Sequence, residues 1–320
     1  MRLIETLLLL ANGFTFLALA VSLPHAVLWI RYSALIALLV AVAQVLVEGP
    51  RWQMVPAYAL AGVFFLIWLR QTIAPLSGPA HRLAVSVVAA LGVFGLVVSV
   101  VLPVGLPVFR FPHPNGPYQI GTLTYHWVDA NRSEIFSVDP NARRELMVQI
   151  WYPAKSDSSS PRAPYMQDAD TVAPALARLL QWPEFILGHF KYVTTNAVAS
   201  APMATDQPIY PVLIFLTGLN GFRQSNNFQV EALVSHGYIV VAIDQPYAVA
   251  SVVFPDGRQI NGLTRNQMQP LIQQSLSPVA NAPMLNDQSF TNGSIPYFAQ
   301  DVSFTLDQLT LWTRLTRTIF

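Results

Sequence analysis

One segment of the sequence combines residue types that suit acyl-transfer chemistry. It is FLTGLNGFR, residues 215–223, in which Gly218 and Gly221 follow the short apolar run Val212–Leu216. Glycines let the backbone turn sharply and let a substrate approach main-chain N–H groups closely. N–H groups presented in this way stabilise the negatively charged oxygen of a tetrahedral intermediate. The same spacing also suits a tight turn between a strand and a helix, so both interpretations stay open.

Four other ionisable residues are candidates for reactive groups. His236 precedes a glycine where a helix is expected to end, and a cation interacting with the helix dipole explains it. Asp244 ends an apolar run, where it is either a catalytic group or a residue of a strand-to-loop turn. His113 and His126 have no partner at the spacing of a known motif. None of the four defines a reaction by itself.

Several kinds of site have no counterpart in the sequence. The absence of cysteine excludes disulfides, thiolate zinc sites and a cysteine nucleophile. No His, Asp or Glu cluster has the spacing of metal ligands, and no phosphate-binding loop of the Gly-x-x-x-x-Gly-Lys-Ser/Thr type occurs. The net charge is +1 and no basic run exists. We therefore expect neither a metal nor another cofactor, and no nucleic acid partner.

The candidate loop is framed by elements of an α/β fold. Val212–Leu216 and Tyr238–Ile243 are continuous apolar runs of strand length, and Phe228–His236 between them has apolar residues at helical spacing. Gly237 supplies the stop of that helix. Continuous apolar strands on either side of a helix indicate a βαβ unit in a parallel sheet that is covered on both faces.

Flanking segments extend this prediction. Tyr118–Trp127 and Glu145–Tyr152 alternate in polarity, which predicts two strands that pair antiparallel. Lys155–Ala163 is expected to be a solvent-exposed loop, Thr171–His189 a helix broken at Pro183, and Asp301–Leu315 a final helix. The aromatic-rich region Ala169–Ala201 forms either packed core or a lid or membrane-facing surface for a lipid ester.

The first third of the chain has a different composition. Overall, 53% of the residues are apolar and only 11% are charged, whereas a soluble domain carries about 25% charged residues. Residues 1–110 contain six arginines and two acidic residues. Four apolar stretches in this region predict about four membrane-spanning helices; they are Leu3–Leu23, Ser33–Val47 (extended by Ala26–Ile30), Met54–Leu69 and Leu83–Val101.

This first third is interpreted as a membrane anchor, which makes the protein a multi-pass membrane protein. Its charged residues lie at the ends of the stretches apart from Glu5, and a transporter would normally place ionisable residues in mid-span. With four spans the arginines divide three against three between the two sides, so the positive-inside rule gives no orientation. A proline-rich linker follows, and the expected domains are residues 1–110 and residues 111–320.

Three longer motifs carry a family resemblance. VQIWYPA, PVLIFLTGLNGFRQSN and LVSHGYIVVAIDQPYAVASVVFPDGR resemble the platelet-activating-factor acetylhydrolase family of α/β-hydrolases, over about Tyr118 to Leu309. The resemblance implies a serine esterase that removes short acyl chains from phospholipids or other lipophilic esters. It also implies that the backbone N–H of Leu219 belongs to the oxyanion hole, with Gly218 and Gly221 shaping the loop. Many members have His-Gly where this chain has Thr217-Gly218.

The nucleophile of that mechanism is missing from the sequence. A Gly-x-Ser-x-Gly elbow needs two glycines four residues apart, and none of the sixteen glycines satisfies this. The sequence therefore predicts a membrane anchor followed by a partial α/β-hydrolase domain with a mostly parallel sheet, in a fragment or frameshifted product without the catalytic Ser, Asp and His. Such a domain would expose an apolar strand edge. The alternative is a non-enzymatic membrane protein that binds a lipid or a protein partner.

Overall fold

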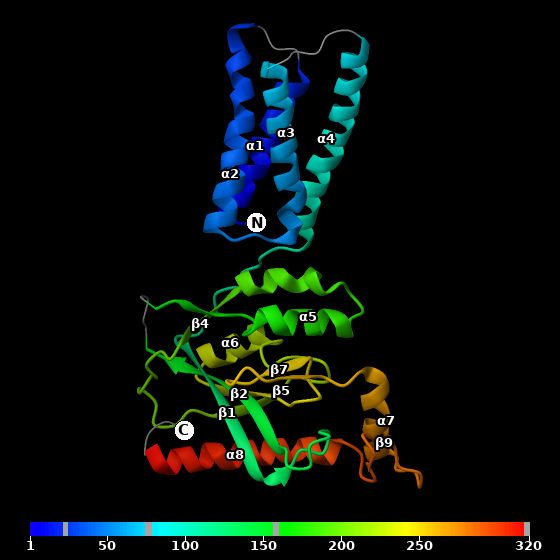
Figure 1. Ribbon diagram of the computed structural model, residues 1–320. Coiled ribbons are helices and arrows are strands. Elements are labelled where there is room, and N and C mark those ends of the chain that lie inside the picture. Colours follow the sequence, from blue (N-terminus) through cyan, green and yellow to red (C-terminus); the bar gives the residue numbers. More distant parts are fainter. Residues whose placement is uncertain (22–24, 74–78, 156–159, 317–320) are drawn as a thin grey trace. The chain divides into compact units, whose positions relative to one another are not determined.

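The computed structural model describes residues 1–21, 25–73, 79–155 and 160–316. The chain divides into two units, Met1–Phe109 and Arg110–Phe320, and each is described by itself (Figure 1).

In its described residues the first unit is entirely helical. Its elements are α1 (Leu3–Ala20), η1 (His25–Tyr32), α2 (Ser33–Val47), η2 (Trp52–Met54), α3 (Val55–Ile73) and α4 (Pro79–Gly105), where η denotes a 3-10 helix. Three segments are long and apolar enough to cross a membrane: Leu3–Ala20, Trp29–Val47 and Trp52–Ile73. The fourth expected stretch lies in α4, where the described side chains begin at Ala89 and the apolar part Ala89–Gly105 is shorter. Residues 22 and 23 of the first expected stretch lie outside the described residues.

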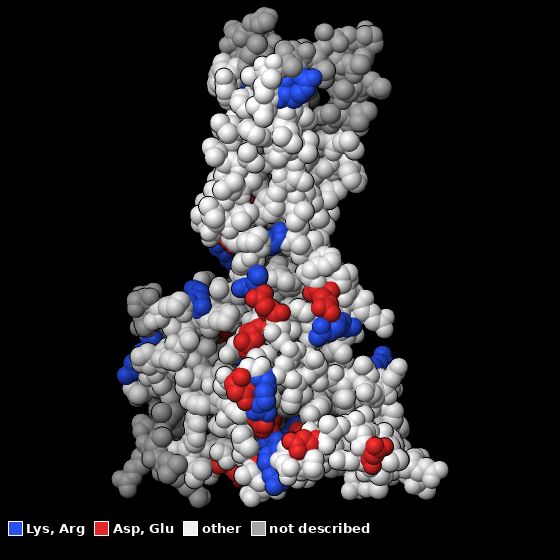
Figure 2. Space-filling view, in the orientation of Figure 1, with Lys and Arg blue, Asp and Glu red and all other residues white. Residues whose placement is uncertain are grey.

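Most buried side chains of the first unit are small or polar, with Leu8, Met54 and Phe64 as large apolar exceptions, and many large apolar side chains are exposed. In α1 the buried residues are Glu5, Leu8, Asn12, Thr15 and Ala18, and the exposed large apolar residues are Leu3, Leu7, Leu10, Phe14 and Leu17. On the face shown in Figure 2 the middle of this unit carries almost only uncharged residues. Large exposed apolar surfaces are unfavourable in water, whereas helices in lipid associate through small and polar side chains. The distribution is the one expected of helices that face hydrocarbon.

Charged residues join the helix ends at one end of this unit. Glu5, which the sequence placed inside a span, is buried and forms a two-pronged ion pair with Arg51, with N···O distances of 2.7 and 2.8 Å. Arg51 Nη1 also donates to the carbonyl oxygen of Leu106 at 2.9 Å, and Arg2 donates to the carbonyl oxygen of Glu48. The beginning of α1 and the end of α4 therefore lie at the same end of the unit.

The second unit is built on a six-stranded sheet in the order β3-β4-β1-β2-β6-β5. The strands are β1 (Gln119–Ser133), β2 (Arg143–Ala154), β3 (Arg162–Pro164), β4 (Thr194–Ala199), β5 (Val212–Leu216) and β6 (Ile239–Asp244). β1, β4, β5 and β6 point in one direction, and β2 and β3 in the other. Because β2 lies between β1 and β6, only β4–β1 and β5–β6 are parallel pairs. The expected parallel character therefore holds for most strand directions but not for most pairings.

The strands that frame the candidate loop are confirmed. β5, α6 (Asn227–Ser235) and β6 form the expected βαβ unit, and the two strands pair in parallel from Val212↔Ile239 to Leu216↔Ile243. β1 and β2 pair antiparallel, as expected, and both extend beyond the predicted bounds. β5 lies at one end of the sheet, and three of its apolar residues are exposed: Val212, Leu213 and Leu216. This is the apolar strand edge that the sequence predicted.

Helices cover both faces of the sheet (Figure 1). Val230 and Val234 of α6 pack with Val240 and Ala242 of β6 on one face. Leu309 of α8 (Ile295–Thr316) packs against the other face, together with a second set of sheet residues that includes Val148, Ile150, Val241 and Ile243. Every residue of β6 is buried. Coverage on both faces explains why this strand appears in the sequence as a continuous apolar run.

Residues 155–201 differ most from the predictions. The helix expected over Thr171–His189 with a break at Pro183 is α5 (Ala169–Leu179) followed by η3 (Glu184–Tyr192), which begins directly after Pro183. Gln181, with a φ of 58°, turns the chain within this break. The second part is a 3-10 helix rather than an α-helix. β4 (Thr194–Ala199) follows, although the whole region Ala169–Ala201 was expected to be helical. In the expected loop Lys155–Ala163, residues 156–159 lie outside the described residues, and the end of the loop belongs to β3.

The remaining elements lie between β6 and the end of the described chain. They are β7 (Ser251–Val253), β8 (Gln259–Asn261), α7 (Arg265–Leu276), β9 (Met284–Leu285), β10 (Gln288–Ser289) and α8. The predicted final helix, Asp301–Leu315, is confirmed within α8, which begins six residues earlier at Ile295. The β7–β8 and β9–β10 pairs are two-stranded sheets separate from the main sheet.

Candidate active site

The glycine-containing loop lies at the carboxyl end of β5, between β5 and α6. Gly218 has a φ of 76°, in the left-handed region that glycine adopts without strain, and Asn220 follows with a φ of 61°. A Cβ atom at Gly221 would lie only 2.6 Å from the carbonyl oxygen of Thr217. The two glycines are therefore required for different reasons, one for backbone conformation and the other for close approach within the loop.

The N–H of Leu219 is available for a ligand. Leu219 is 42% exposed, and its N–H donates to no acceptor within the described part of the chain. The next two amides are occupied, because Asn220 N–H donates to the Ala248 carbonyl at 2.7 Å and Gly221 N–H to the Gly218 carbonyl at 3.3 Å. An unpaired N–H of an exposed residue, on a loop that is fixed on both sides, is what an oxyanion-hole donor requires.

Asp244 holds this loop in place. It is the last residue of β6 and is buried, and both of its carboxylate oxygens accept from Arg223. Oδ1 accepts from the backbone N–H at 2.6 Å and Oδ2 from Nη1 at 2.5 Å. Burial raises the pKa of Asp244 above the ordinary value of an aspartate, and the Arg223 guanidinium acts in the opposite direction. Because both oxygens are engaged in a buried ion pair, Asp244 has a structural role here rather than that of an acid or base.

The two histidines nearest these elements have local partners. His236 is exposed at the end of α6, with Nε2 3.1 Å from Asn115 Oδ1, and Gly237 ends the helix with a φ of 95°, as expected. His126 lies 2.6 Å from a carboxylate oxygen of Glu145. The sequence did not reveal this pair, because the antiparallel pairing of β1 and β2 brings the two residues together. Among the residues that the structure describes, no three His, Asp or Glu side chains form a possible metal site.

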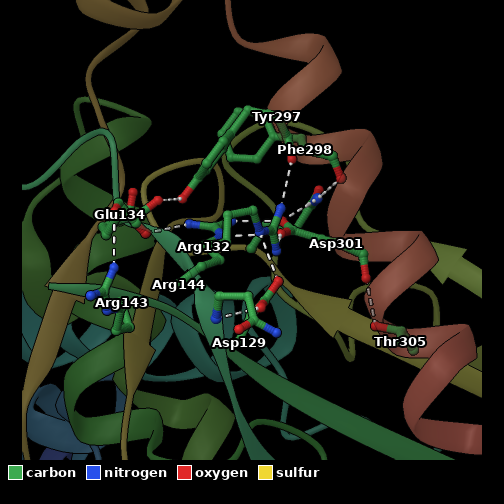
Figure 3. Close-up of polar contacts among 12 residues, drawn as sticks. Asp129, Arg132, Glu134, Arg143, Arg144, Tyr297, Phe298, Asp301 and Thr305 are labelled. Atoms are coloured by element: carbon green, nitrogen blue, oxygen red, sulfur yellow. Dashed lines mark hydrogen bonds and ion pairs between the residues drawn. The ribbon is translucent and has the colours of Figure 1, made fainter.

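A second buried ion-pair network lies near the loop and was not predicted (Figure 3). Arg144, at the beginning of β2, forms two bonds to Asp301 of α8, at 3.1 and 2.7 Å, and one to Glu134 at 2.7 Å. Arg132 also binds Asp301, at 2.6 Å, and Gln245 donates to the same carboxylate at 2.8 Å. Burial would lower the pKa of Arg144, but Asp301 and Glu134 raise it above its usual range. This network fixes α8 and the segment after β6 against β1 and β2.

The aromatic-rich region 169–201 contains both of the environments considered for it. One group of residues is buried in the second unit: Leu187, His189 and Val193. A second group forms an exposed apolar turn between α5 and η3: Leu180, Trp182 and Phe185. The region also reaches the candidate loop, because the Tyr165 ring lies 5.7 Å from the rings of both Phe190 and Phe222.

Comparisons with known proteins address the same elements. The family model described as platelet-activating factor acetylhydrolase, isoform II, matches residues 106–267, which include β1, β2, β5, the loop and β6. Among solved structures, the ferulic acid esterase from Streptomyces cinnamoneus matches with 29% sequence identity and a TM-score of 0.40, covering 53% of this chain and 47% of that chain. The chain thus spans about half the length of that esterase. A comparison with curated proteins finds no matching sequence. Because the family match extends over half of the chain and includes the elements that carry the loop, the chain belongs to the platelet-activating factor acetylhydrolase isoform II family.

Proposed function

We propose that this protein is a membrane-anchored carboxylic ester hydrolase that acts on short acyl esters of phospholipids or other lipophilic esters. In this reaction the Leu219 N–H binds the carbonyl oxygen of the ester and stabilises the charge that develops on it. The observation that carries the proposal is the unpaired N–H of the exposed residue Leu219 on a glycine-shaped loop, in a chain that belongs to this family. No metal or other cofactor is needed for this role.

The glycines of the loop support this assignment. With Gly218 in a left-handed conformation and Gly221 close to the Thr217 carbonyl, the chain turns so that the amides of Asn220 and Gly221 bond inside the protein. The Leu219 amide is left outside these bonds. The 320 residues contain no Gly-x-Ser-x-Gly motif, so the proposal assigns an oxyanion donor, Leu219, and leaves the nucleophile unassigned.

The membrane part of the proposal rests on the first unit. Three of its segments are long and apolar enough to span a bilayer. Many large apolar side chains are exposed, and most of the buried side chains are small or polar. We propose that α4, a helix of 27 residues, is the fourth span. With four spans, and with Arg51 bridging Glu5 and Leu106, the N-terminus and the end of α4 lie on the same side of the membrane. A membrane anchor suits an esterase whose substrates are lipids.

Replacement of Leu219 by proline or alanine tests the oxyanion role. Leu219→Pro removes the N–H, whereas Leu219→Ala keeps it and shortens the side chain. The expected result is that Leu219→Pro lowers kcat by about 10²- to 10³-fold, the usual effect of losing one oxyanion donor. Leu219→Ala should remain close to the original protein. The measurement is hydrolysis of p-nitrophenyl acetate in membranes by a protein that contains these residues together with its nucleophile, with unfolding curves to verify that both variants are folded.

The chain length of the ester tests the substrate class. The proposal expects p-nitrophenyl acetate and butyrate, and a phospholipid with a 2-acetyl group, to be hydrolysed faster than the corresponding long-chain esters. Equal loss of activity in Leu219→Pro and Leu219→Ala would contradict the role of the amide. If a protein that includes the nucleophile hydrolyses these esters no faster than membranes without it, the enzymatic proposal is overturned and a lipid- or partner-binding protein is supported.

A further inference from the structure

One attachment of the oxyanion loop to the sheet is the buried residue Arg223. Asp244 accepts from both the backbone N–H and the side chain of this residue, at 2.6 and 2.5 Å. Asp244 ends β6, which pairs in parallel with β5, the strand that leads into the loop. One carboxylate therefore fixes both the main chain and the side chain four residues after Leu219.

The rest of the Arg223 side chain is also bound. Its Nη2 donates to Gln167 Oε1 at 2.7 Å and its Nε to Gln149 Oε1 at 3.3 Å. Gln149 lies in β2, and its own Nε2 donates to Thr122 Oγ1 in β1 at 2.9 Å. The guanidinium is thus oriented by groups from two further parts of the unit. The loop cannot shift relative to β1 and β2 without breaking these bonds.

Such a network is not explained by stability alone. Arg223 and Asp244 are only 4% and 2% exposed. Transferring two charges out of water costs several kcal/mol per ion, and apolar residues of similar size often stabilise a protein equally well. A buried ion pair has an advantage where the main chain of a loop must be held at a defined distance and orientation. Charge-assisted hydrogen bonds of fixed geometry define the position of the groups that they join more narrowly than apolar contacts do.

The opposite side of the loop is held by a second segment. Asn220 N–H donates to the Ala248 carbonyl at 2.7 Å, and Ala250 N–H donates to the Gly221 carbonyl at 2.8 Å. Both segments contain a residue in the left-handed region, Asn220 and Tyr247, with φ of 61° and 72°. Backbone conformations of this type persist where the surroundings enforce them, and they are frequent at functional sites. The two residues that follow Leu219, Asn220 and Gly221, are therefore both hydrogen-bonded to the segment Ala248–Ala250.

We propose that Arg223 and Asp244 are positioning residues of the ester hydrolase site, which hold the Leu219 N–H where the oxyanion forms. The inference rests on the proposed function and adds to it the residues that determine the position of the donor. Neither side chain contacts the substrate. They act through the main chain of the loop, so their loss lowers the rate of the chemical step and leaves substrate binding nearly unchanged.

A spin label on the loop tests this without requiring any activity. The sequence has no cysteine, so Leu219→Cys introduces a unique attachment site that keeps the backbone N–H. The protein in membranes, labelled at this site, is compared with and without Asp244→Asn. Asp256→Asn is the control, because Asp256 is an exposed carboxylate that pairs with Arg258 on the β7–β8 hairpin. We expect the label to become more mobile with Asp244→Asn and to remain unchanged with Asp256→Asn.

The same substitutions are measured in the protein without the label. Asp244→Asn should lower kcat for p-nitrophenyl acetate by about 10- to 100-fold, the size of effect expected for a misplacement of less than 1 Å, with KM changed by less than about threefold. If Asp244→Asn does not fold, the double variant Arg223→Gln/Asp244→Asn replaces it, because this variant leaves no unpaired buried charge. The double variant should show the same increase in mobility and the same loss in kcat.

The outcomes separate this inference from the proposed function. Unchanged label mobility in a folded Asp244→Asn or double variant would overturn the positioning role, whatever the activity. A lower melting temperature with kcat and KM unchanged would also overturn it, since that result describes a purely structural pair. Absence of hydrolysis by the original protein, together with a more mobile label in the variant, would refute the hydrolase proposal while retaining the anchoring of the loop by Asp244.

Discussion

Replacing Gly221 with alanine tests the geometry of the loop most directly. The new Cβ would lie 2.6 Å from the Thr217 carbonyl oxygen and 3.2 Å from both Cβ and Oγ1 of Thr217. Contacts of Cβ atoms below 3.0 Å essentially do not occur, so the loop has to open by at least about 0.4 Å. The φ of Gly221 is not in the left-handed region. The perturbation is therefore steric and confined to the turn between Thr217 and Gly221.

The size of the effect follows from what surrounds the turn. Ala250 N–H binds the Gly221 carbonyl at 2.8 Å and resists movement on that side, so the displacement is directed toward Leu219. A misplacement of 1 Å can cost about 100-fold in rate, and we expect a loss of about 10-fold in kcat for a shift of roughly half that size. Overpacking should lower the free energy of unfolding by about 1–3 kcal/mol.

Gly188→Ala is the matched control for this substitution. A Cβ at Gly188 would have no heavy atom within 4 Å, and its φ is not in the left-handed region. The assay determines kcat and KM for p-nitrophenyl acetate in membranes, together with denaturant unfolding of the solubilised proteins. Gly188→Ala should match the original protein in both. If Gly221→Ala hydrolysed the ester with unchanged kcat and unfolded at the same denaturant concentration, the close approach in the loop would not matter and the reasoning would be wrong.

Three further outcomes are expected. Arg144→Met leaves Asp301 buried without its main partner and should lower the free energy of unfolding by about 3–5 kcal/mol in a denaturant titration; a loss below about 1 kcal/mol would contradict the role of the network. Burial raises the pKa of Glu145, but Arg258 and His126 bring it below the ordinary value of 4.5. The stabilisation that ionised Glu145 gains from these two partners is therefore complete above about pH 4.5, and it disappears as the pH falls through the lowered pKa. Glu145→Gln should remove this component of the acid dependence of the melting temperature, and an unchanged acid profile would disprove it. Leu216→Lys places a charge on the exposed edge of β5 and should reduce self-association of the solubilised protein in light scattering; unchanged association would show that another surface is responsible.

Local sequence patterns were sufficient for the elements that carry the loop. The continuous apolar runs of β5 and β6 and the helical spacing of α6 predicted the βαβ unit, because an element buried on both faces cannot accommodate polar residues. The glycines at positions 218 and 221 indicated where the chain turns, since each satisfies a steric requirement within a few residues of itself. The motifs also indicated the family, which the match over residues 106–267 confirmed.

Local patterns failed where the outcome depended on distant residues. The break expected at Pro183 is present, but a strand, β4, follows at Thr194–Ala199 where the sequence suggested helix, because it pairs with β1 and β3. The order of the strands, with β2 between β1 and β6, was not predicted. Neither feature has a signal within the range of one helix or one strand.

Local composition and spacing were enough to predict the apolar helices, the βαβ unit and the glycine-containing turn. The groups that hold this turn became apparent from the packing of the elements. From the sequence, Asp244 could be either a catalytic group or a turn residue. In the structure it ends β6 and pairs with Arg223, which lies 21 residues earlier in the chain. Arg144 and Asp301 are separated by 157 residues and meet because α8 packs against the sheet. Spacing within an element constrains which residues share a face, whereas the partner of a buried charge is set by how the elements pack.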